Sequence, residues 1–161
     1  MCLLRSKQNG LTLVEMMVII GVMAILIFAT FRYPDERIRL DTEAQRLASD
    51  LRYVQFLAMT KNSKFRVTFA SDRYSLSDNN NNSYKWPLTG ESSVIIDSDF
   101  ELSWVGSVLP NNYLIFDEDG IPYVSATTKL SSPAVLTLEY GDGGVSQNIT
   151  VTPETGKVSG P

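Results

Sequence analysis

The sequence predicts an α+β fold, in which a long N-terminal helix packs on a C-terminal antiparallel β domain of one or two sheets. Three features support this prediction: an apolar run at Leu11–Phe31, a helical apolar pattern that continues to about Thr60, and a later region in which apolar and polar residues alternate. Helical patterns followed by strand patterns are typical of α+β proteins, where the apolar face of a helix covers a sheet. The chain has 161 residues, 43% of them apolar, which suits one globular domain.

The first element is the apolar run, in which Met16–Phe31 consists almost entirely of Met, Val, Ile, Ala, Leu and Phe. As a helix, Leu11–Phe31 would be about 31 Å long, close to the thickness of the hydrocarbon core of a bilayer. Arg5 and Lys7 precede the run, and positive charge there predicts a cytoplasmic N-terminus. No small-residue cleavage box follows the run, which argues against an ordinary secretory signal. Topology alone leaves an uncleaved signal anchor and a processed leader both open.

One acid, Glu15, lies in this apolar segment five residues after Gly10. An unpaired carboxylate in hydrocarbon costs roughly 2.5–3.5 kcal/mol on insertion scales, so Glu15 requires a partner. The stretch GLTLVE resembles the processing motif of type IV prepilins and type II secretion pseudopilins. The resemblance implies a leader, Met1–Gly10, that a prepilin peptidase removes before N-methylation of Leu11. It also implies that Glu15, the fifth mature residue, is attracted to the N-terminal amine of a neighbouring subunit during assembly. Leu11 departs mildly from the Phe or Met that is usual there.

A second helical pattern follows the apolar run. Pro34 predicts a kink, because proline removes a backbone hydrogen bond, and its position resembles the kink of pilins. One apolar face recurs at three- and four-residue steps: Leu40, Ala44, Leu47, Leu51, Val54 and Ala58. The charged residues between them are expected on solvated faces: Arg39, Glu43, Arg46 and Asp50. We therefore expect a leader at 1–10, a transmembrane and assembly helix at 11–33, an amphipathic helix at 34–62 and a periplasmic β domain at 63–161.

The β domain is predicted from a change of period. In KFRVTFA, Phe65, Val67 and Phe69 alternate with polar residues, which is typical of a half-buried strand. Further strand patterns follow at short intervals in DRYSLS, SVIID, FELSW, YLIFD, IPYVS, AVLTLEY and QNITVTP. Gly, Pro, Asn and Asp separate them, as in an antiparallel domain.

One segment of this region is low in complexity. The run SDNNNNSYKWP (Ser77–Pro87) predicts a mobile loop. Its Tyr84 and Trp86 could form an exposed contact, but we favour packing at the base of the loop.

Two other segments have alternative interpretations. FDEDG offers Asp117, Glu118 and Asp119 as oxygen ligands for calcium. It lacks the spaced ligands of an EF-hand loop, and Asp-Gly is a strong hairpin signal, so we favour a turn. NIT (Asn148–Thr150) matches a glycosylation sequon, and we interpret it as part of a strand.

The composition argues against an enzyme and against a nucleic-acid-binding subunit. The sequence has no histidine, and its only cysteine, Cys2, lies in the expected leader, so we expect no catalytic activity, no cofactor and no metal centre. The net charge is −4, and removal of Arg5 and Lys7 with the leader leaves 12 basic against 18 acidic residues, or −6. DNA affinity depends largely on neutralising phosphates, so we expect no nucleic-acid binding by this subunit alone.

Three further stretches narrow the resemblance. YLIFDEDGIP and NITVTPETGKV resemble an I-x-F-x-x-x-G hairpin and a last strand ending in TG-K/R-V of GspH/FimT-type minor pilins. LASDLRYVQFLAMTKN resembles the second helix segment of that family, and its LRYVQ is also similar to minor pilins of the mannose-sensitive haemagglutinin pilus. The resemblance does not separate these systems.

This resemblance implies a subunit that helps to initiate, or to form the tip region of, a type IV pilus or a type II secretion pseudopilus. The alternative is an adhesive or DNA-binding minor pilin displayed at the tip. The implied partners are other pilins or pseudopilins, the prepilin peptidase and an assembly platform in the inner membrane. The implied location is the bacterial inner membrane, crossed once, with a cytoplasmic N-terminus and a periplasmic C-terminal domain, followed by assembly into the fibre.

Overall fold

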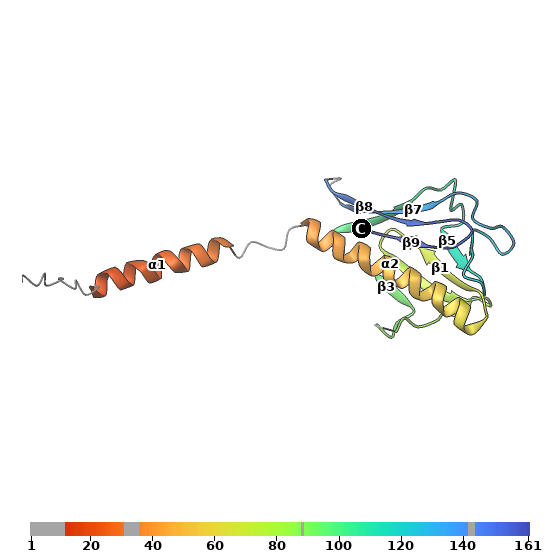
Figure 1. The fold of residues 1–161 in the computed structure, drawn as a ribbon, viewed down its shortest axis with the longest axis horizontal. Helices are drawn as coiled ribbons and strands as arrows, with labels where there is room; N and C mark the ends of the chain where they lie inside the picture. Colours follow the sequence, from red (N-terminus) through yellow and green to blue (C-terminus); the bar gives the residue numbers. More distant parts are fainter. Residues whose placement is uncertain (1–11, 31–35, 88, 142–143) are drawn as a thin grey trace, which may run out of the picture. The chain divides into compact units, whose positions relative to one another are not determined.

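A computed structural model describes residues 12–30, 36–87, 89–141 and 144–161, with the backbone alone for residues 27–30. The chain divides into two units, Met1–Asp35 and Glu36–Pro161, and each is described by itself. The helices and strands, shown in Figure 1, are α1 (Leu13–Thr30), α2 (Glu36–Lys61), β1 (Phe65–Phe69), β2 (Arg73–Asp78), β3 (Ser93–Ile95), β4 (Phe100–Trp104), β5 (Tyr113–Phe116), β6 (Pro122–Tyr123), β7 (Ala134–Tyr140), β8 (Ser146–Val151) and β9 (Val158–Ser159).

The first unit contains α1, whose sequence is apolar on every side except at Glu15. Its large apolar side chains are exposed within the unit; Leu13, for example, is 75% exposed. Within the described parts of the chain, no helix is both long enough and apolar enough to cross a membrane. The predicted transmembrane segment, 11–33, extends beyond the described residues at both ends.

The second unit is built on α2. The predicted apolar face is confirmed, because all six of its residues are buried: Leu40, Ala44, Leu47, Leu51, Val54 and Ala58. The helix ends with Asn62 in the left-handed conformation (φ 50°), and the N–H of Ser63 donates to the carbonyl of Ala58 at 3.1 Å. This hydrogen bond satisfies a carbonyl of the last turn, in the manner of a Schellman motif.

The strands form two antiparallel sheets, which confirms the predicted antiparallel domain of one or two sheets. The first sheet has the order β3-β2-β1-β5-β6 and the second the order β4-β7-β8-β9. Figure 1 shows α2 running across the domain, with β7 and β8 on one side of it in this view and β3 on the other. The helix contacts β1 and β5 of the first sheet and β7, β8 and β9 of the second. One helix face therefore covers both sheets, and the core lies between these three layers.

The last strand differs from the prediction. The family resemblance implied one last strand that ends in TGKV, whereas the strand pattern QNITVTP stops at Pro153. The structure divides the stretch NITVTPETGKV into β8 and β9, which pair antiparallel through Val151 and Val158. Pro153 has no N–H to donate to a ladder, so the strand ends before it. Glu154 and Gly156 both adopt φ 62°, and the N–H of Gly156 donates to the carbonyl of Thr152 at 3.1 Å. The chain thus reverses direction within the motif.

The loop after β2 packs as predicted. Trp86 is 1% exposed and its ring meets that of Tyr74 edge-on, with centroids 5.4 Å apart. Tyr84 is half-buried and packs edge-on against Phe65. The Asn-rich part forms a turn in which one carboxylate oxygen of Asp78 accepts the backbone N–H groups of residues 80 and 82. The prediction of a mobile loop stays a prediction.

Candidate functional site

The predicted assembly residue, Glu15, lies in the first turn of α1. The helix begins at Leu13, so Thr12 is its N-cap. The backbone N–H and the hydroxyl of Thr12 donate to the carboxylate of Glu15 at 3.2 and 3.3 Å. In return, the N–H of Glu15 donates to the hydroxyl of Thr12 at 3.3 Å. This reciprocal arrangement is a capping box, which satisfies backbone donors that the first helical turn leaves without partners.

The capping box gives Glu15 a local role that the sequence analysis did not identify, although T-x-x-E is a recognisable signal for it. A carboxylate in the first turn also interacts favourably with the helix dipole. The side chain of Glu15 is exposed, and its neighbours Val14 and Met16 are exposed apolar residues. The acid is therefore held at one end of an apolar surface and remains accessible to a cation from outside this unit.

Three other predicted site residues lie outside the described residues. They are Gly10 and Leu11, at the predicted cleavage and methylation position, and Pro34, at the predicted kink. The structure describes the chain on both sides of Pro34, with α1 ending at Thr30 and α2 beginning at Glu36.

The three further stretches that carry the resemblance to GspH/FimT-type minor pilins, one in α2 and two in the β domain, meet at one place in the second unit. Gln55 of α2 donates its side-chain N–H groups to the carbonyl of Gly120 and to that of Thr155, each at 2.9 Å. Gly120 lies in the turn between β5 and β6 of the first sheet, and Thr155 in the turn between β8 and β9 of the second. A single amide group thus joins the helix to both sheets. We call this cluster, Gln55, Gly120, Thr155 and Gly156, the motif junction.

Close packing explains the two glycines of the motif junction. A Cβ at Gly156 would overlap the carbonyl oxygen of Gly120 and lie 2.7 Å from the side-chain nitrogen of Gln55. It would also lie 3.2 Å from the ring of Phe116. Gly120 has φ +77° and faces the Gln55 side chain. Both positions need a left-handed backbone and no side chain, which only glycine provides without strain.

A neighbouring contact extends the motif junction along α2. Arg52, one turn before Gln55, donates from its guanidinium to the carbonyl of Val158 in β9 at 3.1 and 3.3 Å. The Arg and Gln of the LRYVQ stretch therefore both bind backbone carbonyls around the TGKV stretch. The motifs that the sequence analysis used only as signs of family resemblance are parts of one tertiary contact.

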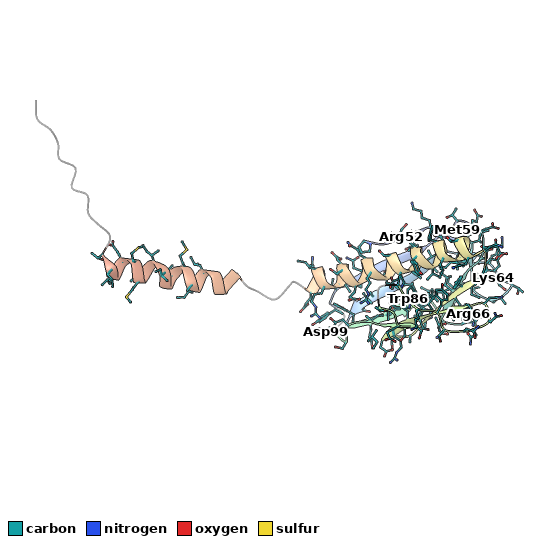
Figure 2. All side chains as sticks on the ribbon, turned by 90° about the horizontal axis from the view of Figure 1, so that it is seen from below. Arg52, Met59, Lys64, Arg66, Trp86 and Asp99 are labelled. Atoms are coloured by element: carbon teal, nitrogen blue, oxygen red, sulfur yellow. The ribbon has the colours of Figure 1, made fainter. Side chains whose placement is uncertain are left out.

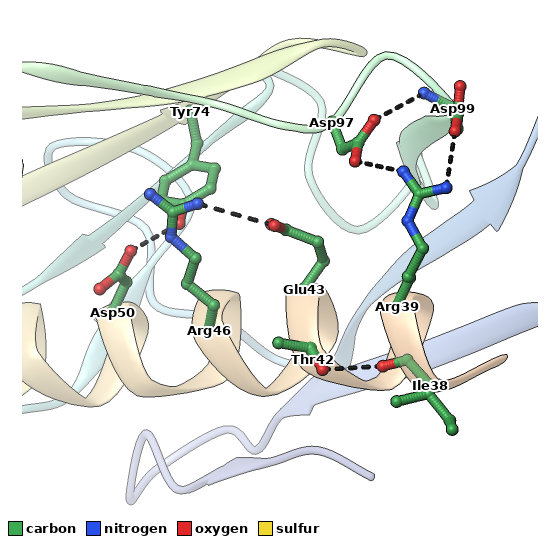
Figure 3. Close-up of polar contacts among 9 residues, drawn as sticks. All are labelled: Ile38, Arg39, Thr42, Glu43, Arg46, Asp50, Tyr74, Asp97 and Asp99. Carbon is green, nitrogen blue, oxygen red and sulfur yellow. Dashed lines mark hydrogen bonds and ion pairs between the residues drawn. The ribbon is translucent and has the colours of Figure 1, made fainter. Parts of the chain in front are cut away.

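The charged residues of α2 lie differently from the prediction of a solvated face. Arg39 forms ion pairs with Asp97 at 2.5 Å and with Asp99 at 2.9 Å, which joins the helix to the segment between β3 and β4 (Figure 3). The guanidinium of Arg39 lowers the pKa of the Asp97 carboxyl. Arg46 makes the predicted kind of local pair, with Glu43 three residues earlier, at 3.7 Å.

Asp50 is the clearest departure, because it is buried, with 8% of its surface exposed. The hydroxyl of Tyr74 in β2 donates to its carboxylate at 2.5 Å (Figure 3). Burial raises the pKa of the Asp50 carboxyl, while the Tyr74 hydrogen bond and Arg46 oppose that rise. Burial and the nearby Asp50 also raise the pKa of the Tyr74 hydroxyl. Asp50 therefore lies in the interface between α2 and the first sheet. Helical periodicity could not predict this position, because the partner of Asp50, Tyr74, lies on a strand.

The acidic segment FDEDG forms the favoured turn rather than a spaced set of ligands. Phe116 and Pro122 pair across it, and the N–H of Gly120 donates to the backbone carbonyl of Asp117 at 2.9 Å. One side-chain oxygen of Asp117 accepts the N–H groups of residues 119 and 121. Among the described residues, no group of three or more acidic, His or Cys side chains is placed to hold a metal ion. NIT lies in β8, as predicted.

The fold, an N-terminal helix followed by a helix packed on antiparallel sheets, defines a pilin-like subunit. The fold is similar to that of the minor pseudopilin EpsH from the type 2 secretion system of Vibrio cholerae. The TM-score is 0.57 and the identity 14%, and the match covers 76% of this chain and 96% of that one. The type IV minor pilin FimU of Pseudomonas aeruginosa gives TM-score 0.55 and 14% identity, covering 76% and 92%. At these identities the likeness establishes the fold alone. No curated protein matches the chain.

Family models identify the chain more closely. Residues 5–31 match the prokaryotic N-terminal methylation motif, and residues 43–156 match the type II transport protein GspH. The chain belongs to the GspH family, whose members are minor pseudopilins and minor pilins of type II secretion systems and type IV pili. Membership and the methylation motif together imply a membrane-anchored subunit that assembles with other pilin-like subunits into a pilus or pseudopilus.

Proposed function

We propose that this chain is a non-catalytic minor subunit that a prepilin peptidase cuts between Gly10 and Leu11 and methylates at Leu11. The carboxylate of Glu15 then pairs with the new N-terminal amine of a neighbouring subunit. The observation that supports this best is the position of Glu15, an accessible acid at the end of an apolar helix inside the matched methylation motif. In a medium of low dielectric, such a pair is far stronger than at a wet surface, and it fixes the axial register of neighbouring helices.

The same proposal includes the topology and the partners. Residues 11–33 would cross the bacterial inner membrane once, with the N-terminus in the cytoplasm and the β domain in the periplasm. Basic residues before the apolar run support this orientation. Pro34 would bend the helix where it leaves the membrane. The assembly platform of the inner membrane and the other pilin-like subunits would be its partners, and the chain would initiate the fibre or form its tip region.

The experiment that tests the processing step is the N-terminal sequence and intact mass of the protein, made in cells with and without a prepilin peptidase. We expect a chain that begins at methylated Leu11 only when the peptidase is present. A matched control is a Gly10→Val chain, which should keep Met1 in both strains. A wild-type chain that still begins at Met1, or one cut near Phe31, would contradict the proposal and indicate an ordinary anchor or signal.

A further inference from the structure

One row of directly opposed residues crosses the outer face of the first sheet. Arg66 of β1 is opposite Ile115 of β5, Ile115 is opposite Tyr123 of β6, and Tyr123 is opposite Lys129. Directly opposed residues in antiparallel strands place their side chains on the same face. This face is the one turned away from the core, since Phe65 and Val67, on either side of Arg66, are buried. Two cationic residues therefore lie in one row, with their backbones about 14 Å apart across three strand spacings.

Tyrosine rings hold these cations, and a third cation joins them. The guanidinium of Arg66 lies 4.5 Å from the centroid of the Tyr113 ring. The ring of Tyr123 has the ammonium of Lys64 at 4.9 Å and that of Lys129 at 5.8 Å. Cation–π contacts restrain long, flexible side chains, so less conformational entropy is lost when an anion binds them. We call Lys64, Arg66 and Lys129, with Tyr113 and Tyr123, the basic row.

Among the described residues, the cations of the basic row form no ion pair with a carboxylate. Ion pairs with carboxylates are present at Arg39, Arg46 and Arg73. In the described residues none joins a carboxylate to Lys64, Arg66 or Lys129. Lys64 donates to a backbone carbonyl at 3.4 Å and Arg66 to the amide oxygen of Asn81 at 3.0 Å. The nearest acid that shares a hollow with them is Asp78, which lines one beside Lys64 and Arg66 without forming an ion pair. Three cations without ion pairs therefore lie close together in a chain whose net charge is −4.

A hollow of about 240 Å³ adjoins the row at Lys129. Hydroxyl-bearing residues line it beside this lysine: Ser107, Thr128, Ser131 and Ser132. Such a hollow has room for a small polar side chain. Figure 2 shows Arg66 on the side of the domain away from Arg52 and Met59 of α2.

We propose that the basic row is a docking surface for a carboxylate-bearing segment of a different, neighbouring subunit of the fibre. This inference rests on the proposed function, because it requires such neighbours. Nucleic acid is the weaker fit, since bases stack on open aromatic faces and here cations already cover the tyrosine rings. Three cations also neutralise few phosphates. A second copy of the chain is a weaker fit too, because like net charge opposes self-association.

Binding can be tested with the purified full chain in detergent and a fluorescent decaglutamate peptide, using anisotropy at low and high salt. The patch variant carries Lys64→Gln, Arg66→Gln and Lys129→Gln. The control variant carries Lys61→Gln, Lys85→Gln and Lys157→Gln, which changes the net charge equally. We expect the patch variant to bind about tenfold more weakly, as loss of three partly exposed ion pairs predicts, and the control less than threefold. An equal loss in both variants would overturn the proposal.

Two further measurements on the same variants would assign the basic row to another occupant. If an oligothymidylate of equal charge binds more tightly than the peptide and only the patch variant loses it, the occupant is nucleic acid. If the chain sediments as a dimer that the patch variant dissociates, the occupant is a second copy. Either result would overturn the proposal that the partner is a different subunit.

Incorporation into fibres in cells then separates this inference from the proposed function. We expect wild type and control to co-purify with fibres, and the patch variant to be processed normally but incorporated several-fold less. Equal incorporation of all three would overturn the docking surface and leave the proposed function standing. Absence of the processed wild-type chain from fibres would contradict the proposed function itself, and the peptide measurement would still decide whether the basic row binds carboxylates.

Discussion

Gly156 lies against the carbonyl of Gly120, although the two residues belong to turns of different sheets. Gln55 binds the carbonyl of Gly120 and that of Thr155 beside Gly156, so the helix and both sheets meet at this contact. The arrangement fixes one sheet against the other without a disulfide.

Replacing Gly156 by alanine should strongly destabilise the protein. The new Cβ would overlap the Gly120 carbonyl, and φ at this position is +62°. A left-handed alanine costs roughly 1–2 kcal/mol, and overpacking adds a similar amount, so we expect a loss of about 3 kcal/mol. Chemical denaturation of the full chain in detergent measures it. Gly90→Ala is the matched control, since Gly90 has φ +70° with nothing within 4 Å of the added Cβ, and should cost only the backbone penalty. Equal losses would contradict the packing argument.

Gln55→Leu should remove both hydrogen bonds of the motif junction and replace the amide by an apolar side chain that is one atom shorter. Two carbonyls would lose their partners, which we expect to lower the free energy of unfolding by about 1–3 kcal/mol. Gln45→Leu, at an exposed position of the same helix, should change stability by less than about 0.5 kcal/mol. The same denaturation experiment compares them. If the two variants were equally stable, the bridge between the sheets would contribute nothing.

Asp50 predicts a specific pH dependence. Its pKa is raised in the folded protein, so its contribution to stability is fully present below the unfolded value of about 3.9 and is lost as pH rises through the folded value. Asp50→Asn keeps an oxygen acceptor for the Tyr74 hydroxyl and cannot ionise. We therefore expect the wild type to lose stability relative to Asp50→Asn as the pH is raised above about 4. Parallel thermal melts of both chains across the acidic range test this; a constant difference between them would show that Asp50 does not titrate differently on folding.

Glu15 variants can separate the local role of this residue from assembly. Glu15→Gln keeps a side chain that can complete the capping box with Thr12 but removes the charge. Glu15→Leu removes both. If an ion pair drives incorporation, both variants should be cleaved normally and incorporated into fibres at least tenfold less than wild type, as quantified by immunoblotting of purified fibres. Wild-type incorporation of Glu15→Gln, with loss only in Glu15→Leu, would assign Glu15 to helix capping instead.

Local patterns allowed much of the fold to be predicted. The apolar steps from Leu40 to Ala58 and the alternation from Phe65 to Phe69 depend on periods of 3.6 and 2, which the chain carries within each element. Turn chemistry likewise identified the hairpin at Gly120. The strand pattern QNITVTP ended at Pro153, close to the end of β8, whereas the family resemblance implied a last strand that continued to TGKV.

What the sequence by itself determined is therefore the order and type of the elements, the methylation motif with its single acid, and the likeness to a family. Only the tertiary structure decided what Gln55, Asp50 and Arg66 do. Gln55 meets Gly120 across 65 residues of chain and Thr155 across 100, and Asp50 meets Tyr74 across 24. Arg66 shares a face with Lys129 through the register of three strands. Such contacts depend on how separate elements pack and align, and no local period encodes that alignment.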